Sequence, residues 1–136
     1  SPKDGDDAFL IVEQMPTFRG GDLNTFRDWV KLNVKYPVDM HKQGVEGRVV
    51  ATFIINRDGS LSDVKILQSP NAEFSREVLS VLGRSPKWTP GQQKGKTVRV
   101  KYTIPVDFRI PAGREYRGDG RPANPSRMGG SQITQF

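Results

Sequence analysis

The feature that most constrains the fold is an unbroken alternation of side-chain types between Lys96 and Ile110. Apolar residues occupy every even-numbered position from 98 to 110, and the positions between them hold Arg99, Lys101, Thr103, Pro105, Asp107 and Arg109. Alternation with a period of two sends the two sets of side chains to opposite faces of a sheet. The pattern predicts one long strand, with an apolar face on a core and a cationic face in water.

Pro105 predicts where this strand lies in its sheet. Proline has no N–H to donate, so within sheets it is confined to edge strands and bulges. A long edge strand exposes unpaired backbone groups and must be covered or used. We therefore interpret the strand as a docking edge for another chain.

Two amphipathic helices are predicted upstream of this strand. The first begins after an N-cap at Asp22 and ends at Tyr36-Pro37, because a residue before proline disfavours helical dihedrals. One more helical turn is expected over residues 38–43. The second long helix begins at Ser69-Pro70-Asn71, where Ser69 or Asn71 is the cap, and ends at Gly83.

Two further strands are predicted between the helices. Residues 47–56 are apolar on both faces, which is typical of a central strand. Asn56-Arg57-Asp58-Gly59 is a strong hairpin turn, and residues 61–68 return as the partner strand. Residues 87–96, rich in Gly and Pro, are expected to form an irregular connector.

These elements predict an α+β domain. A right-handed crossover through the second helix places the last strand beside the first, which gives a small three-stranded antiparallel sheet in the order 2-1-3 with both helices packed on one face. We expect residues 1–7 to be disordered, residues 8–110 to form the domain, and residues 111–136 to be a disordered tail rich in Gly, Pro and Arg. The short apolar run 8–12 is compatible with a strand, and whether it covers the docking edge is left open.

The composition excludes several kinds of chemistry. Cysteine is absent and His41 is the only histidine, which rules out thiolate catalysis and multi-histidine metal sites. No phosphate-binding glycine loop follows a strand. We therefore expect no enzymatic activity and no cofactor.

Charge leaves nucleic-acid binding as an alternative. Residues 84–136 contain 11 Lys or Arg and 3 Asp or Glu, whereas residues 1–83 contain 10 and 12. A basic strand face bearing Arg99, Lys101 and Arg109 suits a nucleic acid, but single-strand binders also need exposed aromatic rings. The aromatic residues of the strand fall on the core face, which leaves Trp88 as the one candidate platform, and we expect that ring to be a core lid instead.

Several segments resemble the C-terminal domain of TonB. They are Asn33-Val34-Lys35-Tyr36-Pro37, Gly44-Val45-Glu46-Gly47-Arg48-Val49, Asn56-Arg57-Asp58-Gly59 through Val64, Pro86-Lys87-Trp88-Thr89-Pro90-Gly91, and Lys94-Gly95-Lys96 through Val106. Met15-Pro16-Thr17-Phe18-Arg19-Gly20-Gly21 is similar to the lead-in of the Bacteroidetes-type branch. The likeness spans residues 9–110 and leaves the tail outside the usual pattern.

The resemblance implies a periplasmic energy-transducing domain. Such a domain binds the TonB box of outer-membrane transporters by adding it as a strand to the last strand, and it transmits force from the inner-membrane ExbB–ExbD motor for uptake of siderophores, haem, glycans or vitamins. Strand addition before Pro105 predicts a docking edge made of Thr97, Val98, Arg99, Val100, Lys101, Tyr102, Thr103 and Ile104. Arg99 and Lys101 would steer acidic flanks of the partner peptide.

The resemblance also implies a setting and leaves alternatives. The abrupt start at Ser1-Pro2 is typical of an excised fragment, so we expect an N-terminal inner-membrane anchor upstream. A similar domain is appended to membrane metallopeptidases of the antibiotic-sensor type, which would make this chain a periplasmic sensor module. A homodimer formed through the same edge also stays open.

Overall fold

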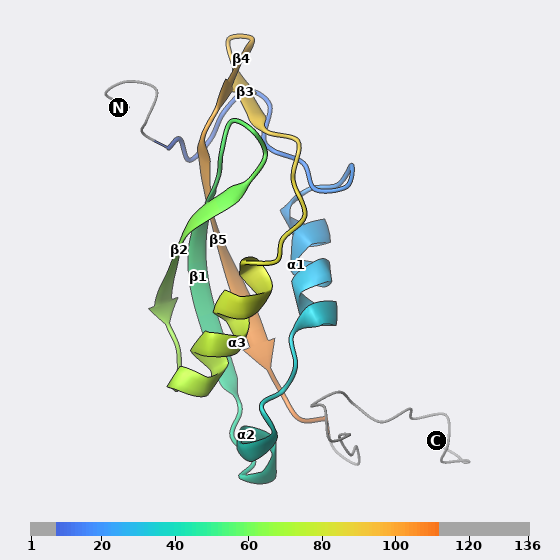
Figure 1. Ribbon diagram of the computed structural model, residues 1–136, viewed down its shortest axis with the longest axis vertical. Helices are drawn as coiled ribbons and strands as arrows, with labels where there is room; N and C mark the ends of the chain where they lie inside the picture. The colour runs from blue at the N-terminus through green and yellow to red at the C-terminus, as the bar shows by residue number, and fades with distance from the viewer. Residues whose placement is uncertain (1–7, 112–136) are drawn as a thin grey trace, which may run out of the picture.

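The computed structural model describes residues 8–111 and shows a curved three-stranded sheet with helices on one face (Figure 1). The sheet contains β1 (Gly47–Ile55), β2 (Leu61–Gln68) and β5 (Val100–Phe108), all antiparallel and in the order β2-β1-β5. The predicted order 2-1-3 and the edge position of the last strand are confirmed. The expectations of disorder for residues 1–7 and for the tail lie outside the described residues, apart from Pro111.

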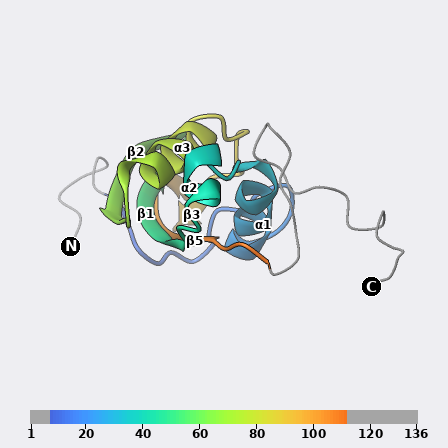
Figure 2. The same ribbon diagram turned by 90° about the horizontal axis from the view of Figure 1, so that it is seen from below.

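Two long helices cover the same face of the sheet. α1 (Leu23–Asn33) packs against β5, and α3 (Ala72–Leu82) packs against β2 and β1, as the view along the strands shows (Figure 2). Both helices have the side-chain caps that their sequences predict: Asp22 Oδ1 accepts from Asn24 N at 2.9 Å, and Asn71 Oδ1 accepts from Phe74 N at 2.9 Å. The single-turn helix α2 (Val38–Lys42) connects α1 to β1. No helix within residues 8–111 is long and apolar enough to cross a membrane.

The core lies between the helices and the sheet and contains two aromatic clusters. Around α1, the rings of Phe26, Phe53 and Trp88 lie 4.8–6.1 Å apart, measured between centroids. At the opposite end, Phe74 and Phe108 stack at 4.2 Å. Trp88 is only 4% exposed, so the expectation that it is a core lid is confirmed.

The prediction of one strand from Lys96 to Ile110 is wrong. The chain forms two strands, β4 (Lys96–Val98) and β5, and β4 pairs with β3 (Gly91–Gln93) in a hairpin separate from the main sheet. The turn uses Lys94 and Gly95, both with positive φ, at 53° and 74°. Alternation predicts the face of the sheet on which each side chain lies. It does not predict which strand is the neighbour, so it does not reveal that the segment is divided into β4 and β5. The connector at residues 87–96 is correspondingly less irregular than predicted.

Candidate peptide-docking edge

The outer edge of β5 is the candidate site, and its register with β1 fixes which backbone groups point outward. The two strands pair without a bulge from Gly47 opposite Phe108 to Ile55 opposite Val100. In an antiparallel pair, every second residue directs its N–H and C=O away from the partner strand. Lys101 N donates to Phe9 O at 2.8 Å, outside the β1 pairing, so the odd-numbered residues of β5 face outward. Pro105 is one of them, and its missing N–H leaves the β1 ladder intact.

The first part of this edge is covered by residues 8–21, which we call the N-terminal segment. Phe9 N donates to Arg99 O at 2.9 Å and Phe9 O accepts from Lys101 N, forming a parallel bridge between Phe9 and Val100. Phe9, from the apolar run 8–12, therefore covers the start of the edge, which answers a question that the sequence leaves open. We call Arg99–Lys101 the covered segment.

The N-terminal segment continues along the β3 hairpin and the connector that precedes it. Gln14 and Gln92 exchange two backbone hydrogen bonds at 2.8 and 3.1 Å, and Thr17 and Thr89 exchange two at 2.9 and 3.0 Å. Gly91 lets the segment lie this close, because a Cβ there would come within 2.9 Å of Val100 Cγ2 and 3.1 Å of Gln14 O. The pairing of Phe9 with the edge of β5 is thus one part of a longer series of contacts that the N-terminal segment makes.

The second part of the edge, Thr103–Phe108, is open. Among residues 8–111, the only bridge to the outer side of β5 is the one that Phe9 makes with Val100. The outward groups of Thr103 and Asp107, together with the C=O of Pro105, therefore have no strand beside them within the described residues. We call Thr103–Phe108 the open segment.

The eight residues predicted to form the docking edge are thus divided among different environments. Thr97 and Val98 belong to β4 and pair with β3, and Arg99 to Lys101 are covered. The hydroxyl of Tyr102 donates to Pro16 O at 3.3 Å, and the side chain of Ile104 is buried in the core. Thr103 alone among them presents outward N–H and C=O groups without a neighbouring strand in residues 8–111.

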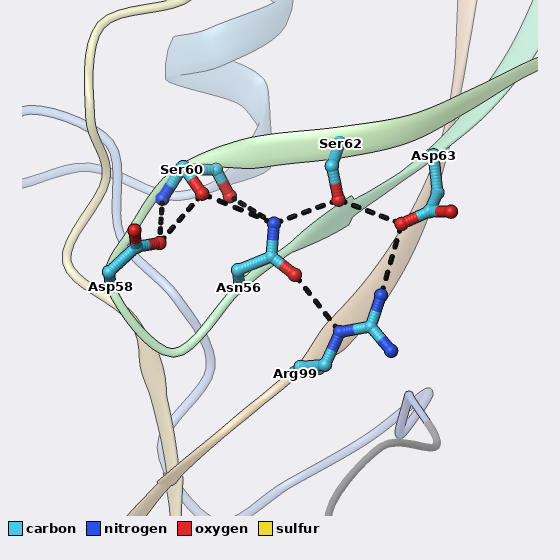
Figure 3. Close-up of polar contacts among 6 residues, drawn as sticks. All are labelled: Asn56, Asp58, Ser60, Ser62, Asp63 and Arg99. Carbon is cyan, nitrogen blue, oxygen red and sulfur yellow. Dashed lines mark hydrogen bonds and ion pairs between the residues drawn. The ribbon is translucent and has the colours of Figure 1, made fainter.

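Arg99 does not have the predicted environment of a free steering cation. Its Nε donates to Asn56 Oδ1 at 2.9 Å and its Nη2 donates to Asp63 Oδ2 at 3.0 Å, as Figure 3 shows. Asp63 adopts a φ of 55° at an irregularity in the β1–β2 pairing, where the register shifts between Thr52 and Ile54. The guanidinium ties the β1–β2 hairpin to the junction of β4 and β5, so among the two cations proposed for steering only Lys101 keeps an exposed position.

The same polar cluster orders the hairpin turn. Asp58 Oδ1 accepts from the backbone N–H of Ser60 at 2.9 Å and from its hydroxyl at 2.6 Å (Figure 3). These hydrogen bonds hold the pKa of Asp58 below its usual value. Gly59 is required at the turn, since its φ is 86° and a Cβ would meet Trp88 O at 2.0 Å. Asn56-Arg57-Asp58-Gly59 therefore has a structural role, as the sequence predicts.

A groove of about 580 Å³ lies between α1 and the open segment. Its lining residues come from α1, from β5 and from the residues just after β5: Asn24, Arg27, Asp28, Val30, Lys31, Pro105, Val106, Asp107, Arg109 and Pro111. Arg48 contacts Asp107 with two hydrogen bonds, at 2.7 and 3.1 Å. These bonds are the main cause that lowers the pKa of Asp107, and the charges of Arg109 and Arg27 lower it further.

Other kinds of chemistry find little support in the described residues. Within residues 8–111, no group of three or more His, Cys, Asp or Glu side chains could hold a metal ion. Trp88, the platform that nucleic-acid binding would need, is buried among Phe18, Phe26 and Tyr102.

Sequence reasoning missed the bridge of Phe9 and the groove beside α1. The apolar run 8–12 gives a weak signal, because a run this short does not identify its partner strand. In the sequence, the cations of α1 look like those of an ordinary solvent-exposed helix face. Their position beside β5 depends on how α1 packs, which the sequence pattern does not show.

An α+β domain whose sheet has an open edge beside a charged groove presents the kind of surface that peptide-binding domains use. The family model described as "Gram-negative bacterial TonB protein C-terminal" matches residues 33–110. The chain belongs to the TonB C-terminal domain family. Residues 8–32, which include all of α1 except its last residue, lie outside the matched range.

The chain is also similar to the following proteins. Protein TonB of Pseudomonas aeruginosa is 34% identical over 76 residues, which are 55% of this chain and 22% of that protein. The solution structure of the C-terminal domain of TonB from Pseudomonas aeruginosa has 33% identity and a TM-score of 0.49, and covers 57% of this chain and 78% of its own. A Helicobacter pylori TonB C-terminal domain has 24% identity and a TM-score of 0.50, and covers 65% and 80%. The chain thus spans about a fifth of the length of the Pseudomonas TonB protein.

Proposed function

We propose that this domain binds the TonB box of outer-membrane transporters by β-strand addition at the outer edge of β5. The observation that carries the proposal is the open segment, whose outward groups at Thr103 and Asp107 have no strand beside them within residues 8–111. Membership of the TonB C-terminal domain family supports this choice of partner. In strand addition, main-chain hydrogen bonds provide affinity and side-chain pockets set the register.

The proposed role is mechanical and not catalytic. The domain lies in the periplasm, as part of a longer protein that is anchored in the inner membrane and coupled to ExbB and ExbD. Force pulls along β5 when a transporter is bound, so the hydrogen bonds of the ladder are loaded together in shear. Each contributes about 1 kcal/mol net, and a joint load on several is harder to break than the same bonds opened in turn.

We propose a docking edge that begins further along the strand than the sequence predicts. The sequence predicts docking at Thr97–Ile104, whereas the segment open in residues 8–111 begins at Thr103. We propose that a partner strand first pairs with the open segment. Extension to Lys101 then requires it to replace Phe9, which holds the outward groups of the covered segment.

A titration tests the proposal. TonB-box peptides from transporters of the same cell are added to the isotope-labelled chain while the backbone amides are recorded by NMR. We expect shifts at Thr103 and Asp107 that saturate, with weaker effects along β2, which lies on the far side of the sheet. A matched peptide with N-methylated backbone amides keeps the side chains but cannot complete the ladder, and it should not bind. Absence of binding at millimolar peptide would contradict strand addition.

A further inference from the structure

The groove between α1 and the open segment lies where a side chain of a strand added to β5 would contact it. Even-numbered residues of β5, such as Ile104 and Val106, direct their side chains toward the helices and are buried there. Residues directly opposite each other in adjacent strands share a face of the sheet. A residue of the added strand opposite Val106 therefore points to the side of α1.

The cations of the groove favour a carboxylate there. Arg27 and Lys31 are exposed side chains on α1, and Arg109 follows the end of β5. Two carboxylates also line the groove, but Asp107 is already paired with Arg48, which leaves Asp28 as the opposing charge. The pKa of Asp107 is lowered mainly by the hydrogen bonds from Arg48, and the charges of Arg109 and Arg27 lower it further, so both of these guanidiniums lie near enough to act on a carboxylate at this edge.

The charge of the chain itself argues for an occupant from another molecule. Pro111 lines the groove, and the residues that follow it contain four arginines and two carboxylates. A basic segment is poorly matched to a groove with three cations, because like charges repel at short range. An acidic extended peptide is the complementary occupant.

We infer that the groove between α1 and β5 selects an aspartate or glutamate on the docking strand, at the position that faces Arg27 and Lys31. The inference rests on the proposed strand addition and adds the chemical preference of the partner. It also gives a role to Arg27 and Lys31 of α1, which lie outside the residues matched by the family model. Guanidinium and carboxylate groups form charge-assisted hydrogen bonds, and long flexible side chains on α1 adapt to either acid.

The test uses two short threonine-rich host peptides that differ only in a central glutamate or glutamine. Their affinities for the full chain are measured by NMR titration at low salt. We expect the glutamate peptide to bind about threefold to tenfold more tightly, which is the range of a partly exposed ion pair with more than one cation. The double variant Arg27→Gln, Lys31→Gln should lose this preference.

A charge-matched control separates the groove from net charge. The double variant Lys42→Gln, Lys65→Gln removes two exposed cations from α2 and β2, away from the groove, and should keep the preference. Circular dichroism of both double variants checks that they fold.

Each other outcome overturns the inference. Equal affinity of the two peptides, with shifts at Thr103 and Asp107, overturns it while strand addition stands. A preference that survives in the Arg27→Gln, Lys31→Gln variant places charge recognition elsewhere. Binding of neither peptide at millimolar concentration overturns both proposals, as does salt-sensitive binding of a short oligonucleotide in place of the peptides.

Discussion

The two parts of the outer edge of β5 belong to one strand but have different neighbours. The covered segment is paired with Phe9, whereas the open segment faces a groove and no strand within residues 8–111. Both share the same alternation and the same antiparallel pairing with β1. The difference comes from outside β5, because residues 8–21 cover one part and α1 borders the other.

This comparison shows what the region before the family domain adds. Residues 8–32 lie outside the match to the family model at residues 33–110, yet they contact the edge of the last strand along much of its length. A chain that began at residue 33 would leave the whole edge of β5 without either neighbour. The added region therefore limits where a partner strand can pair and determines the charge beside it.

The largest effect is expected from Gly91→Ala, which disturbs the covered segment only. The new Cβ would come within 2.9 Å of Val100 Cγ2 and 3.1 Å of Gln14 O, so the N-terminal segment must move. Overpacking of this kind costs about 1–3 kcal/mol of unfolding free energy. Urea denaturation measures the loss, and hydrogen exchange at Lys101 should become faster while exchange at the amides of β1 changes little.

Gly83→Ala is the matched control for this substitution. Gly83 has a φ of −67° and its nearest contact is Leu79 O at 3.3 Å, so alanine fits its backbone. The free energy of unfolding of Gly83→Ala should stay within about 1 kcal/mol of that of the unsubstituted protein. An unchanged Lys101 exchange rate in Gly91→Ala would contradict the link between Gly91 and the coverage of the edge.

Thr103→Pro tests the open segment. The N–H of Thr103 points away from β1, so its removal leaves the sheet intact but takes the first outward donor from an added strand. We expect peptide affinity to fall about tenfold or more, because a net hydrogen bond of about 1 kcal/mol is lost and the ring obstructs the approach. Isothermal titration calorimetry measures the affinity.

Thr103→Val keeps the N–H and the branched shape, and it should bind the peptide within about twofold of the original. If Thr103→Pro also bound normally, the partner would not use this edge. A melting temperature far below that of Thr103→Val would instead show that the N–H supports the fold.

The fold was largely predictable because its periodicities are strong. The alternation of β5, the turn at Asn56-Arg57-Asp58-Gly59 and the cap at Asp22 each act through local geometry that the sequence states directly. The environment of the edge was not predictable in the same way. The bridge of Phe9 to Val100 joins residues far apart in sequence through main-chain atoms, and main-chain groups carry no sequence signal.

The role of Arg99 shows the same limit for side chains. Its position on the polar face of the strand predicts exposure, but a bulge in β2 brings Asp63 within 3.0 Å and occupies the guanidinium. The groove likewise depends on how α1 packs on β5, which the helical pattern alone does not determine.

Phe9→Pro is expected to uncover Arg99–Lys101 with a smaller loss of stability than Gly91→Ala causes. Proline removes the N–H that donates to Arg99 O, and the adjacent bond from Lys101 N to Phe9 O should weaken with it. We expect a loss of about 1 kcal/mol in stability and an affinity for peptide that rises about threefold, because a longer ladder becomes available. NMR shifts on peptide addition should then extend to Lys101, whereas in Phe9→Leu they should not.

The smallest effect concerns the pH dependence at the end of the open segment. The hydrogen bonds from Arg48 hold the pKa of Asp107 below its usual value, so the pair stabilises the fold above about pH 3.9, the pKa of an unfolded aspartate. That stability is lost as the pH falls through the lower folded pKa. Asp107→Asn should therefore flatten the acid side of the stability curve, measured by urea denaturation between about pH 5 and pH 2.

Arg48→Gln gives the matching test from the other strand. Because Arg48 is the main cause of the lowered pKa of Asp107, its removal should flatten the same part of the curve, and adding Asp107→Asn should bring little further change. Peptide binding by strand addition at Thr103 should persist in both variants at neutral pH. If the unfolding free energy still fell fully at acid pH after either substitution, another carboxylate would be responsible. The pH response would then come from a group outside the Arg48–Asp107 pair.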